Sequence, residues 1–315
     1  MTEPHRTAVV ALGGNALSPP GERSTIADQF RHTRESLAPI VDLARDGWRL
    51  CVVHGNGPQV GDELIRNEVA RGEVEPLPLG VLVAATAGWI GYMIQQSFDN
   101  ALRKAGVARS VTTIVTQVEV DPSDSALLHP SKFIGHAIPG ERASALIGEG
   151  HAVKQDSNGM YRRVVGSPVP LGIHDMEIIK PLVENGTIVI ACGGGGVPVY
   201  TDALKNLEGV DAIIDKDAVA AVLAGELGAE LLLILTSVDA VYADWGTPAK
   251  RALSRMSVAE ARTLDASKAF GEGSMAPKVR AAAGFVSKTG GRAIIAALDQ
   301  GMEAVQGRAG TTIAD

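Results

Sequence analysis

The chain has 315 residues, of which 45% are hydrophobic and 4% aromatic, and its 29 basic and 36 acidic side chains give a net charge of -7. This composition indicates a globular protein with a large aliphatic core, and it disfavours nucleic acid and anionic membranes as partners because no basic run is long enough to follow a phosphate backbone. No stretch reaches 18 uncharged apolar residues and the first residues lack a signal-peptide pattern, so we expect a cytoplasmic protein.

Short apolar runs recur along the chain and alternate with helical patterns. The strand-like runs occupy 7–12, 49–54, 111–116, 187–192 and 231–236. Several are continuous rather than alternating, as expected for strands covered on both faces. Residues 88–106 and 216–229 carry apolar side chains at helical spacing. The pattern predicts an α/β fold with a mainly parallel sheet sandwiched by helices.

The stretch from about 119 to 170 breaks this rhythm. Prolines, glycines and polar turns replace the strand and helix periods there. Ordered segments of that length without regular periodicity are usually functional. We therefore expect an inserted lobe or lid in this stretch. The length of the chain allows either two domains or one large α/β domain.

Three of the strand-like runs end in glycine-rich turns: LGGN (12–15), HGNGPQVG (54–61) and CGGGG (192–196). The carboxyl ends of parallel strands share one edge of a sheet, where ligands bind in open α/β folds. Backbone N–H groups in such turns bind anions well. Four successive glycines, each costing roughly 0.5 to 1 kcal/mol of chain entropy, indicate left-handed dihedrals or a close approach to the backbone. We expect the turn itself to explain one or two of the four, and a ligand the others.

Standard nucleotide fingerprints are not met. The string GEGSMAPK (271–278) lacks the GK[ST] ending of a P-loop, and the glycines at 55, 57 and 61 are spaced one residue too widely for a dinucleotide turn. A Rossmann-type oxidoreductase is therefore the weakest of the alternatives.

Asp215, Lys216 and Asp217 lie where a strand-like run turns into a helix. In the plainer interpretation one aspartate caps the helix and the lysine is solvated. A lysine between two carboxylates at this edge could instead contact a polyphosphate while an aspartate fixes its orientation. His54 is expected to be a satisfied histidine at a strand end, and Cys51 and Cys192 to be buried reduced thiols.

Nine strings in chain order resemble the carbamate kinases, a family of the amino acid kinase superfamily. They are ALGGNAL, HGNGPQVG, GWIGYMIQQ, HPSKFIG, RRVVGSPVP, CGGGGVPV, GVDAIIDKDAVAAVLA, TSVDAVY and GSMAPKV, and they cover about residues 7 to 300. The resemblance implies a single domain spanning 1–315: a three-layer αβα sandwich with a central, mainly parallel sheet of about eight strands and a protruding lid subdomain at about 119–170.

The same resemblance implies reversible phosphoryl transfer from Mg-ATP to carbamate, giving ADP and carbamoyl phosphate, in arginine catabolism for ATP generation. Carbamate is already an anion, so its attack on phosphorus needs no general base. What the protein must supply is in-line positioning and positive charge against two anions that repel each other.

Four residues match the family's catalytic positions. Lys216 matches the lysine that contacts the transferring phosphoryl group, and Asp217 the carboxylate that organises it. Lys278 matches the lysine near the nucleotide phosphates, and Lys132 the lysine that the protruding subdomain lowers over carbamate and γ-phosphate.

Further residues are expected to bind the substrates. The substrate and phosphate contacts implied by the resemblance come from Gly13, Gly14, Asn15, Gly55, Asn56, Gly57, Gly194 and Gly195. Tyr242 and Met275 join Lys216 and Lys278 at the nucleotide, with Tyr242 against adenine, although both also suit simple packing. Mg²⁺ is expected on the ATP phosphates without a direct protein ligand, and the protein is expected to be a homodimer.

The chain departs from the family pattern at His129, Phe133, Tyr161, Gly166 and Ala276. The first four of these positions fall in or near the lid, which contacts the acceptor, so a superfamily enzyme acting on another small carboxylate stays open. A non-catalytic nucleotide or metabolite sensor on the same fold is a third alternative. The intact set of lysines argues against it, because a sensor has little physical need for charge at the γ-phosphate.

Overall fold

A computed structural model describes residues 6–14, 17–18, 25–156, 158–270 and 275–315 of the chain. Its centre is an eight-stranded sheet, ordered β15 (Arg255–Met256), β17 (Thr311–Ile313), β16 (Arg292–Ala297), β12 (Leu231–Thr236), β1 (Thr7–Leu12), β2 (Arg49–His54), β9 (Ile188–Ile190) and β3 (Val111–Thr113). β16 pairs with β17 antiparallel and the six other neighbouring pairs are parallel. The predicted central, mainly parallel sheet is therefore confirmed.

The continuous apolar runs arise because this sheet is covered on both faces. Along β1, Val9 and Ala11 pack in a core on one face, whereas Ala8 and Val10 pack in a core on the other. Successive side chains of a strand point to opposite faces, so a strand buried on both sides has no polar positions to alternate with.

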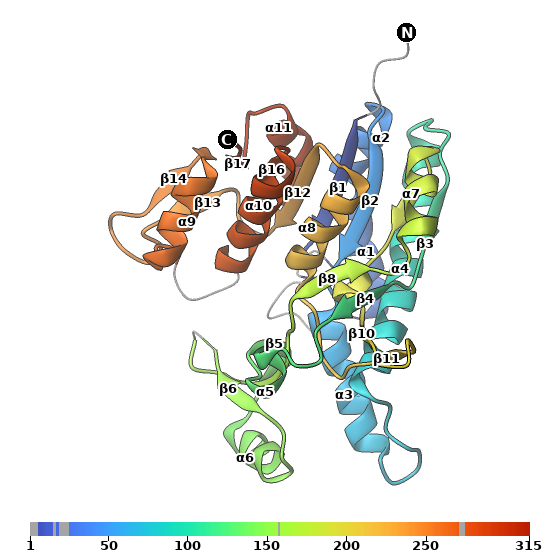
Figure 1. Ribbon diagram of the computed structural model, residues 1–315, viewed down its shortest axis with the longest axis vertical. Helices are drawn as coiled ribbons and strands as arrows, with labels where there is room; N and C mark the ends of the chain where they lie inside the picture. The colour runs from blue at the N-terminus through green and yellow to red at the C-terminus, as the bar shows by residue number, and fades with distance from the viewer. Residues whose placement is uncertain (1–5, 15–16, 19–24, 157, 271–274) are drawn as a thin grey trace.

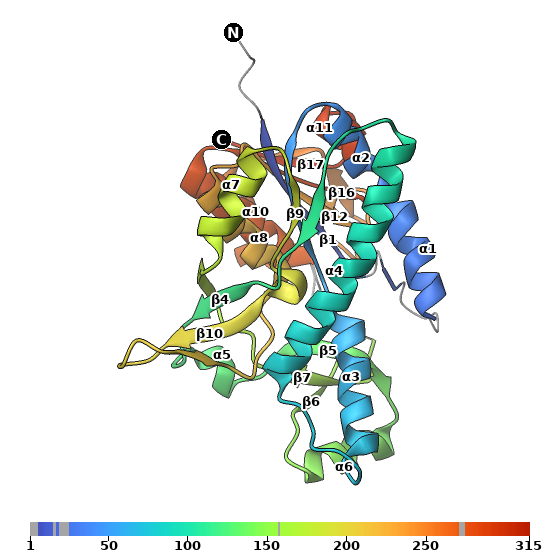
Figure 2. The ribbon, with the colours of Figure 1, turned by 90° about the vertical axis from the view of Figure 1, so that its right-hand side faces the viewer.

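Helices form the two outer layers, as Figures 1 and 2 show. One face carries α7 (Met176–Glu184), α8 (Lys216–Leu227), α9 (Val258–Ala266) and α10 (Met275–Thr289). The other carries α1 (Ile26–Ser36), α2 (Ala38–Arg45), α4 (Leu79–Lys104) and α11 (Gly301–Val305), with the short 3-10 turn η3 (Leu298–Gln300) before α11. The three-layer αβα sandwich is thereby confirmed.

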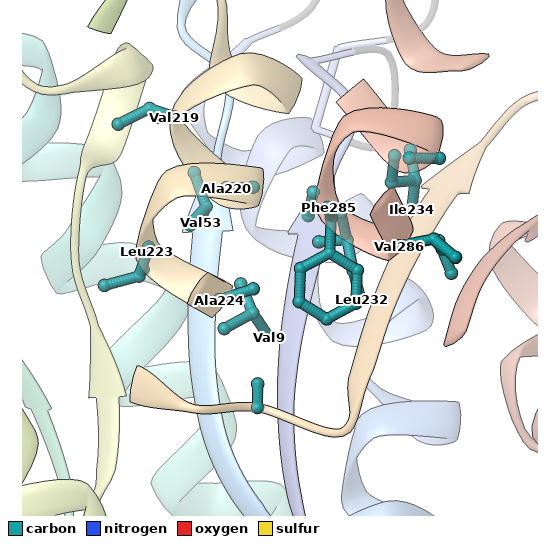
Figure 3. Packing of buried hydrophobic residues seen from close by; sticks show 14 of the residues in the cluster. Val9, Val53, Val219, Ala220, Leu223, Ala224, Leu232, Ile234, Phe285 and Val286 are labelled. Atoms are coloured by element: carbon teal, nitrogen blue, oxygen red, sulfur yellow. The ribbon is translucent and has the colours of Figure 1, made fainter. Parts of the chain in front are cut away.

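The layer formed by α8 and α10 fixes the carboxyl edge of the sheet. Figure 3 shows Leu223 of α8 and Phe285 of α10 packed in one cluster with Val9 and Leu232 of the sheet. All four side chains are at most 1% exposed. Burying an aliphatic or aromatic side chain of this size stabilises the fold by about 1.5 to 3 kcal/mol, so the first turns of both helices have rigid support.

A small lobe projects from one end of the sandwich (Figure 1). It contains a three-stranded antiparallel sheet of β5 (Lys132–Ile138), β7 (Tyr161–Val165) and β6 (Val153–Gln155), together with α6 (Gly140–Gly148). We call residues 132–165 the lobe. Its regular structure corrects the expectation that strand and helix periods are absent from 119–170, because strands this short and half exposed leave little periodicity in the sequence.

The remaining elements link the lobe and the edges to the body. A second sheet joins β11 (Leu207–Gly209), β10 (Val197–Thr201), β4 (Gln117–Val120) and β8 (Pro170–Ile173), and a two-stranded one joins β13 (Val241–Ala243) to β14 (Arg251–Leu253). The other helical segments are α3 (Gly57–Ala70), α5 (Ser125–Leu128) and the 3-10 turn η2 (Gly193–Gly195). Among the described residues, none of the helices is both long and apolar enough to traverse a lipid bilayer.

Candidate active site

The start of α8 holds the most heavily charged part of the sheet edge. Asp215 caps this helix, accepting hydrogen bonds from the N–H groups of Asp217 at 2.9 Å and Ala218 at 3.2 Å. The cap fixes the first turn, so Lys216 and Asp217 project from a defined backbone. The Lys216 ammonium is paired with the Asp217 carboxylate.

Lys278 reaches the same carboxylate from the first turn of α10. Its Nζ lies 3.2 Å from Oδ2 of Asp217, and the Asp217 side chain is only 4% exposed. Burial, followed by the nearby Lys216 ammonium, lowers the pKa of Lys278. We call Lys216, Asp217 and Lys278 the body cluster. It joins α8 and α10, which are adjacent in Figure 1 although far apart in sequence.

Lys132, the first residue of β5 in the lobe, pairs with the other aspartate. Its Nζ lies 2.6 Å from Oδ2 of Asp215, and the two side chains are 26% and 30% exposed. Burial alone would raise the pKa of Asp215, but the Lys132 ammonium, together with Lys216, lowers it well below its usual range. We call Lys132 and Asp215 the lid pair.

The structure thus brings together all four residues predicted to be catalytic, and it adds Asp215. With the three lysines protonated, three positive charges face two carboxylates within one small region. The excess positive charge favours the arrival of an anion. The sequence signal for Asp215 was its place before a helix, which predicted the cap but not the pairing with a lysine 83 residues away.

The glycine turns after β1 and β2 converge on the body cluster. A Cβ on Gly55 would lie 3.1 Å from the amide nitrogen of Gly14 and 3.2 Å from Cδ of Lys216. The N–H groups of Gly13 and Gly55 are already used, because they donate to the carbonyls of Leu235 at 3.2 Å and Leu12 at 3.1 Å. These two bonds continue the sheet, so Gly13 and Gly55 bring chains together rather than offer N–H groups to an anion.

The prediction of anion binding is affected differently for Gly14 and Gly57. Gly57 begins α3, where the first N–H groups of a helix have no partner within the helix and suit an anion. Gly14 lies against Gly55 in the same turn region. The predicted contact from Asn15 lies outside the described residues. The anion-binding roles of Gly14 and Gly57 remain predictions.

The four glycines of CGGGG are explained by the protein's own packing. Three of them have positive φ, namely 70° at Gly194, 99° at Gly195 and 81° at Gly196. A Cβ on each glycine of the run would collide with a neighbour: with His54 Nε2 at 2.4 Å, Asn56 Nδ2 at 2.3 Å, the Ile214 carbonyl oxygen at 2.3 Å and Val118 Cγ2 at 2.3 Å, in chain order. The expectation that the turn alone explains only one or two glycines is therefore too low, since no Cβ fits at any of the four.

Gly194 and Gly195 were also expected to contact a phosphate. The N–H of Gly195 donates to the Cys192 carbonyl at 2.9 Å, within the turn. Cys192, which precedes the turn, is also left-handed, with a φ of 51°. A direct contact between either glycine and a ligand stays a prediction, and the geometry supports it less for Gly195 than for Gly194.

The buried side chains of His54 and Asn56 pack against this turn. His54 is fully buried, and its Nδ1–H donates to the Gly55 carbonyl at 3.1 Å. Burial lowers the pKa of His54 to about 4, so the ring is neutral at physiological pH. The Asn56 amide donates to Thr86 Oγ1 of α4 at 2.9 Å. The expectation of a satisfied histidine holds only for Nδ1, because Nε2 is buried and has no hydrogen-bond partner among the described residues. Asn56 uses at least one donor for structure.

Tyr242 lies in β13 and Met275 in α10. The Tyr242 hydroxyl donates to Asp239 at 2.9 Å, and the Lys250 ammonium lies 4.2 Å from the centre of its ring. Met275 is the first residue of α10 and packs against the core beneath that helix. These contacts are structural, and the contacts of Tyr242 with adenine and of Met275 with the nucleotide remain predictions.

No group of three or more histidine, cysteine, aspartate or glutamate side chains that could hold a metal ion occurs within the described parts of the chain. The carboxylates nearest the expected phosphates, Asp215 and Asp217, are both paired with lysines. The donor set therefore fits a Mg²⁺ ion that arrives on the nucleotide phosphates, and that route remains a prediction.

Comparisons with known proteins agree with this geometry. Residues 6–297 match the model of the amino acid kinase family. The chain is 45% identical to the carbamate kinase of Escherichia coli strain K12 and 41% identical to that of Pyrococcus furiosus, over 98% of this chain and 99% of each relative. The solved carbamate kinase from Giardia lamblia bound to AMP-PNP is 35% identical, covers 98% of both chains and has a TM-score of 0.90.

Proposed function

Since the chain belongs to the amino acid kinase family and, within it, to the carbamate kinases, we propose that its two groups of charges divide one phosphoryl transfer between them. The reaction reversibly transfers a phosphoryl group from ATP to carbamate, giving ADP and carbamoyl phosphate. In this division the body cluster receives the transferring phosphoryl group and the nucleotide phosphates, and the lid pair serves the acceptor.

The body cluster is suited to a transition state that carries more spread charge than either substrate. In the ATP-forming direction, a β-phosphate oxygen of ADP attacks the phosphorus of carbamoyl phosphate, and the bond from phosphorus to the carbamate oxygen breaks. Carbamate leaves as an anion, so no proton has to be moved at this step. Lys216 and Lys278, held by a buried carboxylate, present fixed positive charge where it is needed.

Lys132 would leave Asp215 for the acceptor when the substrates bind. The pair joins the lobe to α8 and is roughly a quarter to a third exposed. An ion pair with this exposure is worth about 1 kcal/mol or less, so the exchange of Asp215 for a substrate oxygen costs little. Lys132 then adds positive charge between two anions that would otherwise repel each other.

The nucleotide, the metal ion, the pathway, the assembly and the location each rest on different support. ATP or ADP as the nucleotide is supported by the Giardia lamblia structure that carries AMP-PNP. Mg²⁺ is treated as part of the nucleotide substrate. The role in arginine catabolism, the homodimer and the cytoplasmic location rest on the family resemblance and the sequence, and they remain predictions.

A different small carboxylate as acceptor is the second candidate, because Phe133 next to Lys132 departs from the family pattern. In the structure the Phe133 ring lies 5.5 Å from the Arg162 guanidinium, both within the lobe. This stacking places the changed side chain against the lobe itself. The observation that carries carbamate as the first candidate is the body cluster with Lys132 intact in a chain 41% to 46% identical to carbamate kinases.

The experiment mixes the purified protein with ADP, magnesium and carbamoyl phosphate and follows ATP formation. We expect turnover by the wild type and a kcat lower by roughly 100-fold or more in Lys216→Ala, as is common when a transition-state charge contact is lost. Lys180→Ala, at an exposed position on α7, is the matched control and should turn over normally. Acetyl phosphate in place of carbamoyl phosphate tests the second candidate. No ATP above the Lys216→Ala background from carbamoyl phosphate contradicts the proposal.

A further inference from the structure

The backbones of the lobe and α3 approach each other closely at two glycines. A Cβ built on Gly61 of α3 would lie 2.1 Å from the Cα of Gly135 in β5, so only two glycines allow these chains to approach. Gly135 has a φ of 65°, which also favours glycine. Beside this contact, Ile134 of β5 and Val60 of α3 belong to one small buried cluster, so the lobe is held near Gly61 and any tilt must pivot there.

Hydrophobic packing does not prevent that tilt on the side away from the catalytic lysines. A cavity of about 470 Å³ separates α3 from the lobe there. Its apolar lining consists of Leu64, Ile65 and Val69 from α3 and Ile134, Ile138 and Leu146 from the lobe. Ile134 and Leu64 also pack in the small buried cluster beside Gly61, whereas Ile65 and Val69 are 48% and 82% exposed, so packing holds the lobe less firmly toward this end of α3.

Glu68 spans this gap. Its Oε1 accepts from a guanidinium NH of Arg163 in β7 at 2.6 Å, and its Oε2 accepts from Arg142 of α6. The side chains of Glu68 and Arg163 are 14% and 18% exposed, so water screens this pair less than a surface pair. Glu68 lies seven residues after Gly61, about two helical turns or 10 Å along the same face of α3. The contact at Gly61 and the ion pairs at Glu68 together define a tilt angle.

The strand pairing carries this tilt to Lys132. Arg163 is opposite Ile134 in the β5–β7 ladder, and Lys132 is opposite Val165 in the same ladder. The Arg163 guanidinium also donates a hydrogen bond to Nδ1 of His151 at 3.0 Å. Any rotation of β7 against α3 therefore moves the start of β5, where Lys132 is located.

We propose that Glu68 is a positioning residue for Lys132: by pairing with Arg142 and Arg163 it sets the angle at which the lobe holds Lys132 over the site. This inference rests on the proposed function, since it assigns Glu68 to the same phosphoryl transfer. Glu68 does not touch the substrates. It acts through the lobe, and its removal should matter only as far as Lys132 matters.

The test replaces Glu68 by glutamine, which keeps the shape and removes the charge. We expect kcat for ATP formation to fall about tenfold, because misplacing a catalytic group by a fraction of an ångström to an ångström typically costs 10-fold to 100-fold. The KM for ADP should stay within about twofold, since the body cluster is untouched. Glu63→Gln is the matched control on the same helix: its partner Arg66 is also on α3, so no contact to the lobe is lost and kcat should not change.

The Lys132→Ala background separates positioning from general structural damage. If Glu68 acts through Lys132, Glu68→Gln has no further effect on the residual rate of Lys132→Ala. An equal tenfold loss in both backgrounds, or unchanged kcat in Glu68→Gln alone, overturns the inference. If Glu68→Gln does not yield folded protein, Arg142→Gln, at a guanidinium 42% exposed, gives the same cycle with an expected loss of about threefold.

Failure of the inference and failure of the proposed function give different results. A wild type without ATP formation contradicts the proposed function. A wild type that is active alongside an equally active Glu68→Gln variant contradicts only the role of Glu68.

Discussion

Lys278 and Lys132 bring the same charge to the site from surroundings that differ in exposure and in attachment. The Lys278 side chain is 9% exposed and extends from a helix packed on the central sheet, whereas Lys132 is 26% exposed and begins a strand of the projecting lobe. A charge that must be in position before the substrates arrive belongs in the body, where packing holds it. A charge that must move is better kept where an ion pair is cheap to break.

This contrast between the body cluster and the lid pair has measurable consequences. Changes in the body should reduce both stability and activity, because a buried charge without its partner destabilises the fold. Changes in the lid pair should affect activity and leave stability nearly unchanged. The following variants test each half of that statement.

The largest effect is expected for Asp217→Asn. It leaves the ammonium groups of Lys216 and Lys278 facing each other without a buried carboxylate, so we expect the free energy of unfolding to fall by about 3 kcal/mol and ATP formation to be lost. Urea unfolding and the ATP assay measure both. Asp265→Asn is the control, since its partner Arg280 is 62% exposed and the pair should contribute less than about 1 kcal/mol. Equal destabilisation by the two variants would remove the distinction between body and surface.

A pH effect on stability is expected from His54. Its pKa is lowered to about 4 in the folded body, against 6.5 for an unperturbed histidine, so between these values the unfolded chain binds a proton that the folded chain does not. Stability therefore falls as pH falls from 6.5 to 4, by at most about 3 kcal/mol from this group. Urea unfolding of the wild type and of His54→Asn at pH 7 and pH 4.5 checks it. A pH dependence that is the same in both proteins would mean that the histidine is not the cause.

Gly194→Ala tests the packing explanation of the glycine turn. The new methyl group would have to fit 2.3 Å from Asn56 Nδ2 at a φ of 70°, so we expect a loss of about 2 kcal/mol or more. Gly159→Ala is the matched control in the lobe, with a φ of 74° and open space around its Cβ position, and should cost about 1 kcal/mol. Thermal unfolding compares the two. If they lose the same stability, the left-handed backbone alone explains Gly194.

The smallest effect on stability is expected for Asp215→Asn in the lid pair. Asparagine caps a helix as well as aspartate does, so the free energy of unfolding should change by less than about 1 kcal/mol. Lys132 no longer has to leave a carboxylate, so the KM for carbamoyl phosphate should fall, by up to about fivefold for a pair worth up to about 1 kcal/mol. Steady-state kinetics measure this change. A raised KM would show that Asp215 holds Lys132 in its productive position.

The fold and the start of the helix at Lys216 were predictable because their sequence signals are local. Continuous apolar strands imply cover on both faces, and an aspartate before the helix at 216 implies a cap, so the position of Lys216 follows from neighbours in the chain. The resemblance to a family added the roles of Lys132 and Lys278, which no local pattern assigns. The geometry then shows that the four residues share one edge of the sheet.

What the sequence could not predict depends on contacts between distant segments. The pairing of Lys132 with Asp215 joins positions 83 residues apart, and the bridge from Glu68 to Arg163 joins positions 95 apart. The reason for four glycines in a row could not be predicted either, because the atoms that exclude each Cβ come from three other segments of the chain. A charge or a glycine in the sequence does not say which partner the fold will bring to it.

Calorimetric titration with ADP and magnesium distinguishes the two parts of the site most directly. If the body cluster binds the nucleotide and the lid pair serves the acceptor, Lys278→Met weakens ADP binding by about tenfold or more, as expected for the loss of a charge-assisted contact to phosphate. Lys132→Ala should keep the Kd for ADP within about twofold while its kcat for ATP formation falls. Equal weakening of ADP binding by the two variants would contradict the division between a fixed body and a movable lid.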